Sequence, residues 1–347
     1  MNTFQSLIQD PRRKKGVATR RKVESEIRHF FVDRNYEEVR TPLIVRSPGM
    51  ETHIRPLELF PRIDSGHSLT GHERIFLPTS PEFAMKKLLA GGLEKIFQIT
   101  PAFRDEPKSK THLCEFTLLE FYETEADLSR LMEITESMVM HIALRLNGTY
   151  SIHYQNTLID LSAGWPRFKI RDLFLEHVGV DLHVSNTPHA LANECKRLGL
   201  FVNPHDTWDD LYFRIWLELV EPKLPQDRAC FVYGYPASQS ALAVKTKDVD
   251  GWEWSKRAEF YIGGIELGNG FEELTDSFEQ RERFEKDMQL RSEIYGDAFP
   301  PSPIDEDFIR ALYEGLPPCS GIAIGVDRLT LLFANETDID YTFYLSV

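Results

Sequence analysis

The chain has 347 residues, of which 42% are hydrophobic and 27% are charged, a composition typical of a folded protein with a sizeable core. No segment approaches the run of about 20 apolar residues that a membrane-spanning helix needs, and no apolar signal core follows the basic cluster Pro11 to Lys15. We therefore expect a soluble, cytoplasmic protein that has no membrane partner.

The net charge of −14 argues against a large nucleic-acid footprint, although it leaves room for a local basic patch between Arg12 and Lys22. The four cysteines are widely spaced and form no Cys-x-x-Cys pair, which argues against a disulfide framework or a zinc site.

Residues 1–18 are interpreted as a loose basic lead-in, and residues 19–347 as a single domain. Apolar residues at helical spacing predict a helix from Thr19 to about Asn35. A short strand at residues 38–41 should follow and end at Pro42, because proline cannot donate to a strand ladder.

The middle of the chain should contain one more helix and two strands before a long amphipathic helix. Thr79 to Glu82 have the composition of a helix N-cap and first turn, with proline and glutamate where helix starts favour them. Residues 96–99 and 113–122 are expected to be strands, and residues 126–148 a helix.

The rest of the chain mixes elements without regular alternation. We expect short helices at 165–225, a strand at 229–235, a hairpin at 259–271, a charged helix at 277–295, and a strand at 322–325 that runs into a helix from Val326. This order favours an α+β fold with an antiparallel sheet flanked by helices over a doubly wound fold.

The loop before the strand at 113–122 carries Arg104, Lys108 and His112, a set suited to triphosphate oxygens. Along that strand, alternation places Phe116, Leu118, Glu120 and Tyr122 on one face. That face suits a pocket in which the phenyl ring stacks a base and the carboxylate and phenol hold an ammonium group. The alternative is an ordinary solvated sheet face.

The hairpin is predicted to turn at Gly263-Gly264, so that Glu259 becomes a diagonal neighbour of Glu266. Two such carboxylates repel unless a cation joins them, and magnesium bound to substrate phosphates is a natural partner. The alternative is two surface carboxylates on an edge hairpin. Further on, Gly325 begins a helix with Arg328 in its first turn, a potential anion site.

The order of these residue groups along the chain resembles that of the signature motifs of class II aminoacyl-tRNA synthetases. Residues 38–42 resemble motif 1, residues 103–116 motif 2 and residues 325–328 motif 3. A finer resemblance to the lysine-specific branch lies in residues 79–82, 119–122 and 265–274.

The resemblance implies an enzyme that uses ATP and Mg²⁺ to form an aminoacyl-adenylate. The implied catalytic residues are Arg104, Glu266 and Arg328. The implied ATP ligands are Arg104, Glu106, His112, Phe116, Glu259, Glu266 and Arg328, of which Glu259 and Glu266 would hold the metal. The implied amino-acid ligands are Ser80, Glu82, Glu120, Tyr122, Asn269, Glu273 and Ala323.

Lysyl-tRNA synthetases carry an N-terminal anticodon-binding barrel, whereas here the catalytic pattern starts within about 20 residues of Met1, which leads us to expect no anticodon-binding domain. In length and layout, and in residues 231–239 and 318–323, the chain is more similar to another group than to the lysyl-tRNA synthetases. These are the stand-alone paralogues that attach (R)-β-lysine, or lysine, to a lysine of elongation factor P. Those paralogues have alanine at the position of Ala323 where the tRNA enzymes have glycine, and one methyl group there would reshape the amino-acid pocket. Leu113-Cys114 departs from the family, which usually has Asn-Pro there.

Two other functions stay open. One is a truncated synthetase that charges tRNA, which the negative charge disfavours, and the other is a non-catalytic synthetase-like regulator, which the retained motif residues disfavour. A homodimer is expected from the resemblance.

Overall fold

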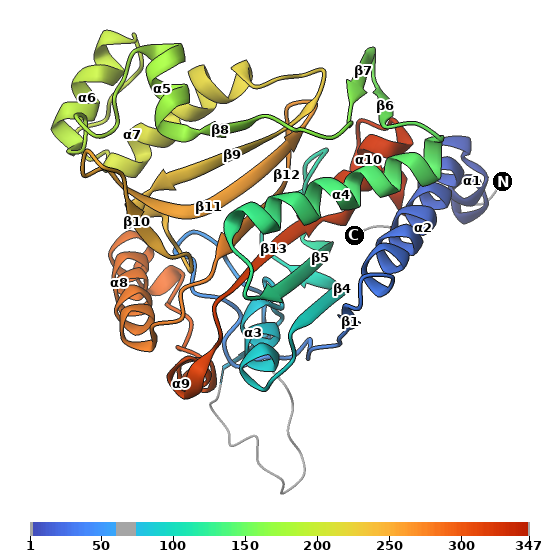
Figure 1. The fold of residues 1–347 in the computed structure, drawn as a ribbon, viewed down its shortest axis with the longest axis horizontal. Coiled ribbons are helices and arrows are strands. Elements are labelled where there is room, and N and C mark those ends of the chain that lie inside the picture. Colours follow the sequence, from blue (N-terminus) through green and yellow to red (C-terminus); the bar gives the residue numbers. More distant parts are fainter. Residues whose placement is uncertain (1–2, 60–73, 346–347) are drawn as a thin grey trace, which may run out of the picture. The chain divides into compact units, whose positions relative to one another are not determined.

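The computed structural model describes residues 3–59 and 74–345 (Figure 1). The chain divides into two compact units: unit 1 comprises residues 1–127 and 273–347, and unit 2 comprises residues 128–272. The region expected to be one domain, residues 19–347, therefore contains parts of both units. Within the described ranges, no helix is both long enough and apolar enough to cross a membrane.

The sheet of unit 1 has the strand order β1–β4–β5–β13, in which β1 is parallel to β4 and the other pairs are antiparallel. The expected strand at 38–41 is shorter than predicted, and β1 ends before Pro42. The bounds are β1 (Glu37–Glu38), β4 (Lys95–Phe103), β5 (Glu115–Thr124) and β13 (Cys319–Gly325), with a separate pair β2 (Glu58–Leu59) and β3 (Ile75–Phe76).

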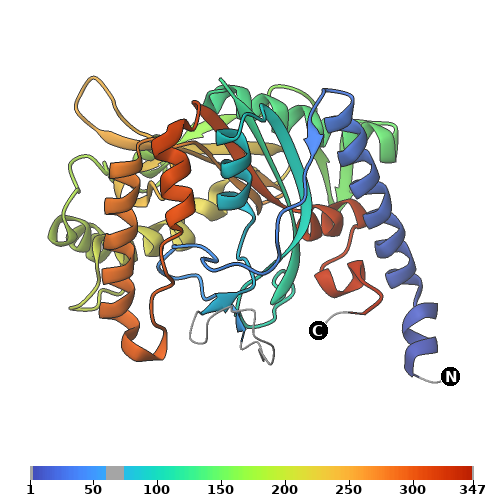
Figure 2. The same ribbon diagram turned by 90° about the horizontal axis from the view of Figure 1, so that it is seen from below.

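The helices of unit 1 pack against this sheet and against one another. They are α1 (Thr3–Gln9), α2 (Pro11–Val32), α3 (Glu82–Ala90), α8 (Ser277–Tyr295), α9 (Glu306–Gly315) and α10 (Val326–Ala334), with short 3-10 turns η4 (Gly296–Ala298) and η5 (Ile339–Thr342). Figures 1 and 2 show α2 beside α10 and the C-terminal segment, which it contacts.

The prediction of a loose lead-in at residues 1–18 is wrong, because α1 and α2 make most of it helical. The Asp10 side chain caps α2 by accepting the Arg12 amide at 2.8 Å. Arg12 pairs with Glu336 at 2.6 Å, and Arg13 pairs with Asp340. The C-terminal segment thus neutralises two cations of the expected basic patch.

Unit 2 has the strand order β8–β9–β11–β12, with β10 also paired to β11. Its strands are β6 (Ser151–Tyr154), β7 (Thr157–Asp160), β8 (Arg167–Lys169), β9 (Ala229–Pro236), β10 (Lys245–Lys247), β11 (Glu253–Ile262) and β12 (Ile265–Glu272). Its helices are α4 (Leu128–Asn147), α5 (Ile170–Val178), α6 (Pro188–Arg197) and α7 (Trp208–Ile215), followed by a π turn η1 (Trp216–Val220) and 3-10 turns η2 (Glu221–Lys223) and η3 (Ala237–Gln239).

The predicted hairpin between β11 and β12 is confirmed. Ile262 pairs with Ile265, and Tyr261 pairs with Glu266. Gly263 and Gly264 have φ values of 59° and 75°, the left-handed conformation that a two-residue hairpin turn demands. Together with the antiparallel pairings of unit 1, this confirms the α+β class.

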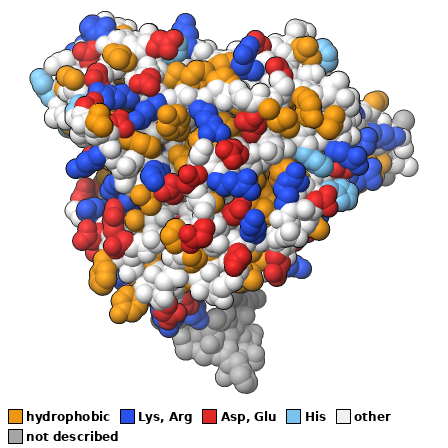
Figure 3. Space-filling model, viewed as in Figure 1, with side chains coloured by type: hydrophobic (Ala, Val, Ile, Leu, Met, Phe, Trp, Pro, Cys, Tyr) orange, Lys and Arg blue, Asp and Glu red, His pale blue; other side chains and the backbone are white. Residues whose placement is uncertain are grey.

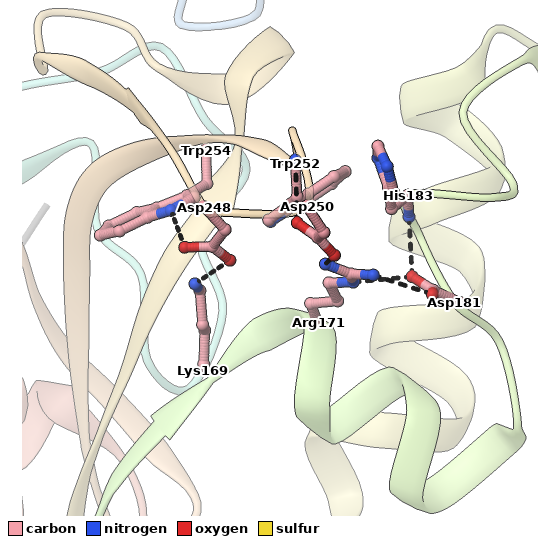
Figure 4. A network of polar contacts seen from close by, with 8 residues as sticks. All are labelled: Lys169, Arg171, Asp181, His183, Asp248, Asp250, Trp252 and Trp254. Atoms are coloured by element: carbon pink, nitrogen blue, oxygen red, sulfur yellow. Dashed lines mark hydrogen bonds and ion pairs between the residues drawn. The ribbon is translucent and has the colours of Figure 1, made fainter.

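Acidic and basic side chains are interspersed over the face shown in Figure 3. In unit 2 such charges form an ordered network around α5 (Figure 4). Arg171 donates to both carboxylate oxygens of Asp181, at 2.7 and 2.9 Å, and to Asp250 at 2.6 Å. Lys169 pairs with Asp248 at 2.5 Å. These contacts hold the loop between β10 and β11 against β8 and α5.

Candidate active site

Strand β5 carries a buried carboxylate in unit 1. Glu120 is fully buried, and its two oxygens accept hydrogen bonds from the Ser80 hydroxyl at 2.6 Å and the Tyr122 hydroxyl at 3.1 Å. The Tyr122 side chain is also buried. The solvated sheet face that the sequence left open is therefore excluded for this part of the strand.

Helix α3 supplies a second carboxylate and a lysine. The helix begins at Glu82, later than the predicted first turn, and the Ser80 hydroxyl accepts the Glu82 amide at 3.0 Å. One turn on, Lys86 is 1% exposed, and its Nζ lies 2.5 Å from Glu82 Oε1 and 2.5 Å from Glu273 Oε2. The sequence reasoning missed Lys86, although the i,i+4 spacing of Glu82 and Lys86 was a usable signal.

Glu273 directly follows β12 and belongs to unit 1. Its amide donates to the Cys319 carbonyl at 2.9 Å, which fixes the backbone beside β13. Its side chain is buried, and Oε1 has no hydrogen-bond partner within residues 3–59 and 74–345. A buried carboxylate oxygen without a donor is costly, so this atom is a natural acceptor for a ligand.

Burial raises the pKa of Glu120 to about 8, with the nearby Glu82 carboxylate adding to the effect. Burial likewise raises the pKa of Glu273 to about 8, and Glu82 and Glu120 reinforce the shift against the lowering by Lys86. For Lys86 the balance is reversed: burial lowers its pKa, but Glu273 and Glu82 together outweigh burial and raise it. The cluster is therefore short of positive charge, as a pocket for an ammonium group should be.

Strand β13 forms the neighbouring wall of the cluster. Gly321 is the cross-strand partner of Tyr122, and a Cβ atom at this glycine would lie 2.1 Å from the tyrosine ring. Only glycine lets the ring lie there. Ala323, half-buried, is the partner of Glu120.

A cavity of about 860 Å³ opens beside the cluster in unit 1, and its lining includes Ser80, Glu82 and Glu51. This volume is in the usual range for a small-molecule site.

The loop between β4 and β5 holds the candidate ATP residues of unit 1. The Arg104 guanidinium lies 5.0 Å from the centre of the Phe116 ring. Its Nε is buried and has no partner in the described part of the chain, so it is available to an anionic ligand. Leu113 is buried, and the Cys114 carbonyl accepts the Arg104 amide at 2.9 Å, so the departure from Asn-Pro leaves the loop closed.

Arg328, in the first turn of α10, points to the same loop. Its Nη2 lies 2.7 Å from Nε2 of His112. The pKa of His112 is lowered by partial burial and then by the Arg328 and Arg104 charges, with Glu106 opposing them. The structure therefore brings Arg104, Glu106, His112 and Arg328 into one electrostatic neighbourhood that would attract phosphate.

Asp327 explains how α10 is fixed. It is buried, pairs with Arg20 of α2 at 2.5 Å and accepts the Thr117 amide at 2.7 Å. Helix α2, strand β5 and helix α10 thus meet at one carboxylate, beside the arginine that projects towards the loop.

In unit 2, Glu259 is buried on β11, which lies between β9 and β12, so the reading as an edge hairpin is wrong for this residue. Its Oε2 accepts the hydroxyls of Tyr235 and Tyr261, each at 2.6 Å, and its Oε1 accepts Arg257 at 2.5 Å. Three donors occupy three of the roughly four lone-pair positions of a carboxylate, which leaves one on Oε1.

Glu266 is half-buried and lies opposite Tyr261, on the face that carries Glu259. Asn269 lies opposite Glu259, and its Oδ1 accepts Arg257 Nε at 2.9 Å. Nowhere in the described ranges do three or more His, Cys, Asp or Glu residues form a group that could hold a metal. Two carboxylates are too few for a protein-only cage but fit a magnesium ion whose other ligands are phosphate and water oxygens.

Comparison with known proteins agrees with this geometry. A family model described as "tRNA synthetases class II (D, K and N)" matches residues 2–345. The chain belongs to this class II synthetase family. Its fold is therefore that of a class II synthetase domain, as predicted.

Relatives that resemble the chain carry two names. A lysine–tRNA ligase of Pelotomaculum thermopropionicum is 36% identical over 342 residues, which are 97% of this chain and 64% of that relative. A lysine–tRNA ligase of Chromohalobacter salexigens is 35% identical over 97% of this chain and 64% of its own length. An elongation factor P–(R)-β-lysine ligase of Hamiltonella defensa is 36% identical over 90% of this chain and 89% of that relative. The chain thus spans just under two thirds of these lysine–tRNA ligases.

Proposed function

We propose that this class II synthetase domain activates a lysine-type amino acid with ATP and transfers it to the ε-amine of a lysine on elongation factor P. We propose (R)-β-lysine as the amino acid. The observation that carries the activation step is the buried cluster of Glu82, Glu120 and Glu273, in which Glu273 Oε1 has no partner among the described residues. A substrate with two ammonium groups needs such buried acceptors, because an unpaired buried charge is strongly unfavourable.

In the proposed complex, Glu120, Tyr122 and Glu273 hold the distal ammonium group, and Glu82 with Ser80 holds the amino group near the carboxylate. Asn269 and Ala323 are further amino-acid ligands. Arg104 binds the α-phosphate and the substrate carboxylate, where its Nε, which has no partner among the described residues, supplies a donor. These groups orient the carboxylate for attack on the α-phosphate, so catalysis is mainly positioning and charge stabilisation.

The remaining ATP contacts are proposed for Phe116 against adenine, Glu106 and His112 in the loop, and Arg328 on the γ-phosphate. Glu259 and Glu266 would hold a magnesium ion that neutralises phosphate charge. The aminoacyl-adenylate forms with release of pyrophosphate. The ε-amine of the acceptor lysine then attacks the adenylate carbonyl, an amide forms, and AMP leaves with loss of a proton from the amine.

Two observations support elongation factor P as acceptor. The alignment with the Hamiltonella defensa relative covers nine tenths of both chains, and Ala323 is the cross-strand partner of Glu120 in the proposed amino-acid pocket. The competing function, charging of tRNA, is favoured by the number of lysine–tRNA ligases that resemble the chain. A non-catalytic regulator is disfavoured, because the pocket carboxylates and both arginines are retained.

ATP–pyrophosphate exchange with α-lysine and with each enantiomer of β-lysine tests the activation step, and we expect the fastest exchange with (R)-β-lysine. Mass spectrometry of elongation factor P after incubation with enzyme, ATP and each isomer tests the transfer step, and we expect a mass increase of one lysyl residue. Transfer to tRNA without modification of elongation factor P would overturn the proposed acceptor, and absence of exchange with all three amino acids would overturn the activation step.

Glu266→Gln tests the metal assignment. The change keeps the side-chain shape but removes the charge that magnesium needs, so exchange should fall at least about 100-fold. Glu314→Gln, an exposed glutamate on α9, is the matched control and should exchange normally. Near-normal exchange by Glu266→Gln at saturating Mg²⁺ would contradict the assignment.

A further inference from the structure

Lys86 is an internal cation that neither the sequence motifs nor the proposed substrate contacts account for. It is a four-carbon side chain with 1% exposure, and its Nζ lies 2.5 Å from one oxygen of Glu82 and 2.5 Å from one oxygen of Glu273. Lysine side chains are almost never fully buried unless they are paired. This one is paired twice, with two of the carboxylates that face the proposed substrate.

The bridge leaves the other side of Glu273 open. Lys86 engages Oε2 of Glu273, whereas Oε1 is buried and lacks a partner among residues 3–59 and 74–345. The carboxylate is therefore held from one side and free to accept on the other. The ammonium group interacts electrostatically with Glu82 of α3, Glu120 of β5 and Cys319 of β13. Its Nζ also lies 5.9 Å from the centre of the Phe308 ring of α9.

A charge count gives the bridge a function. Within the cluster, Glu82, Glu120 and Glu273 carry a charge of −3 when ionised, and Lys86 reduces it to −2. Glu51, which lines the adjoining cavity and acts on Glu82, lies outside this count. Two negative charges match the two ammonium groups of a diamino acid, whose own carboxylate is proposed to meet Arg104. Without the internal cation, the three clustered carboxylates would take up protons, because burial and mutual repulsion both favour the neutral form.

We propose that Lys86 is a positioning and specificity-determining residue: by bridging Glu82 and Glu273 it favours the ionised form of both carboxylates and orients them for an amino acid with two ammonium groups. This inference rests on the proposed function in one respect, namely that the ligand is a lysine-type amino acid. The bridge itself requires only the buried geometry.

The test compares Lys86→Met, which is close in volume but neutral, Lys86→Arg, which keeps the charge, and Lys86→Ala, which leaves a space for added ligands. In exchange assays with the best lysine isomer we expect Lys86→Met to raise KM about 100-fold with a smaller change in kcat, and to narrow the discrimination between lysine and norleucine. Lys86→Arg should recover part of the lost affinity, seen as a lower KM, and part of the discrimination between lysine and norleucine. Lys95→Met, which removes a lysine paired at 3.0 Å with Glu123 outside the pocket, is the matched control and should keep the wild-type KM.

Chemical rescue separates charge from volume. We expect n-butylamine to raise the activity of Lys86→Ala at least several-fold and n-butanol to leave it unchanged, with wild-type enzyme plus butylamine as the control for competition at the lysine site. Equal rescue by the alcohol, or a wild-type KM and discrimination in Lys86→Met, would overturn the proposal.

A readout without substrate keeps the bridge testable on its own. The Tm of Lys86→Ala should rise with butylamine more than with butanol, and this difference should be larger than any difference seen with wild type. If wild type exchanges with no lysine isomer, the proposed function fails while this comparison still decides the bridge. If exchange is normal but neither kinetics nor Tm responds to the charge at position 86, the bridge fails alone. If Lys86→Ala does not fold, the KM and Tm of Lys86→Met and Lys86→Arg are compared instead, and they decide whether the charge at position 86 matters.

Discussion

A single hydrogen atom at position 321 decides where the Tyr122 ring lies. Gly321 stands opposite Tyr122 in the β5–β13 register, and the ring occupies the space that a Cβ atom would need. The tyrosine hydroxyl in turn donates to Glu120 at 3.1 Å. The position of the phenol, and with it one of the two hydrogen bonds on that carboxylate, therefore depends on the absence of a side chain on the next strand.

Gly321→Ala should displace Tyr122, since a contact of 2.1 Å cannot be kept and overpacking of this kind costs about 1–3 kcal/mol. We expect a rise of about tenfold or more in KM for the lysine substrate and a measurable loss of stability in urea unfolding. Gly91→Ala, where the added Cβ would meet Leu88 O at 3.3 Å, is the control for glycine replacement and should keep its KM. An unchanged KM in Gly321→Ala would show that the ring position does not matter for binding.

Helix α2 shows the same close packing at the scale of an element. Gly16 lies where the helix crosses the C-terminal segment, and a Cβ atom there would lie 2.1 Å from the Tyr341 carbonyl oxygen. Around this crossing, Arg12 pairs with Glu336, and its guanidinium stacks 3.7 Å from the centre of the Tyr341 ring. Helix α2 and the segment after α10 are thus fastened together in unit 1, next to the helix that carries Arg328.

Gly16→Ala has two opposing effects on the free energy of unfolding, and we expect the unfavourable one to be larger. Helix propensity alone would make alanine more stable by about 1 kcal/mol, but the clash with a backbone atom cannot be relieved by a rotamer change. We expect a net loss of about 1–3 kcal/mol in the free energy of unfolding, measured by urea denaturation. Ser25→Ala on the exposed face of α2 is the control and should be neutral or slightly stabilising. A more stable Gly16→Ala would mean that α2 does not pack on the C-terminal segment as described.

At the scale of the whole molecule, carboxyl groups with raised pKa values and carboxyl groups with lowered pKa values together set the pH range of stability. Burial raises the pKa of Glu120 and Glu273 from 4.5 to about 8. Asp181 behaves in the opposite way, because hydrogen bonds from Arg171 lower its pKa below 3.8. The raised carboxyls contribute stability that is fully present below pH 4.5 and is lost as the pH rises through about 8, whereas the lowered ones contribute stability that is lost on acidification.

We therefore predict that the free energy of unfolding falls between pH 6 and pH 8.5, by at least about 1 kcal/mol. A lysine substrate should reverse this trend, because ionised carboxylates bind its ammonium groups, so the substrate-induced rise in Tm should grow over the same range. Glu120→Gln should flatten the profile, and the exposed Glu314→Gln should not. A profile that rises from pH 6 to 8.5 without substrate would contradict the raised pKa values.

The sequence by itself determined those features that depend on neighbours along the chain. The Gly263-Gly264 turn fixed the first two pairs of the β11–β12 hairpin, up to the register shift between Phe260 and Tyr261. The periodic helix at 277–295 has its predicted bounds. The alternation along residues 116–122 placed Glu120 and Tyr122 on one face, and the family motifs identified the class II synthetase fold. Turn chemistry and residue periodicity act within a few residues, so one sequence is enough to read them.

Only the tertiary structure decided how distant segments share charges. It fastened residues 11–18 of α2 to the C-terminal segment, where Arg13 meets Asp340 more than 300 residues later. It surrounded Glu259 with Arg257, Tyr235 and Tyr261, and it placed Lys86 between two pocket carboxylates, one of them supplied from residue 273. Such pairs form because burial removes water from each charge and forces it to find a partner, and the partner's position in space is not encoded in the local sequence.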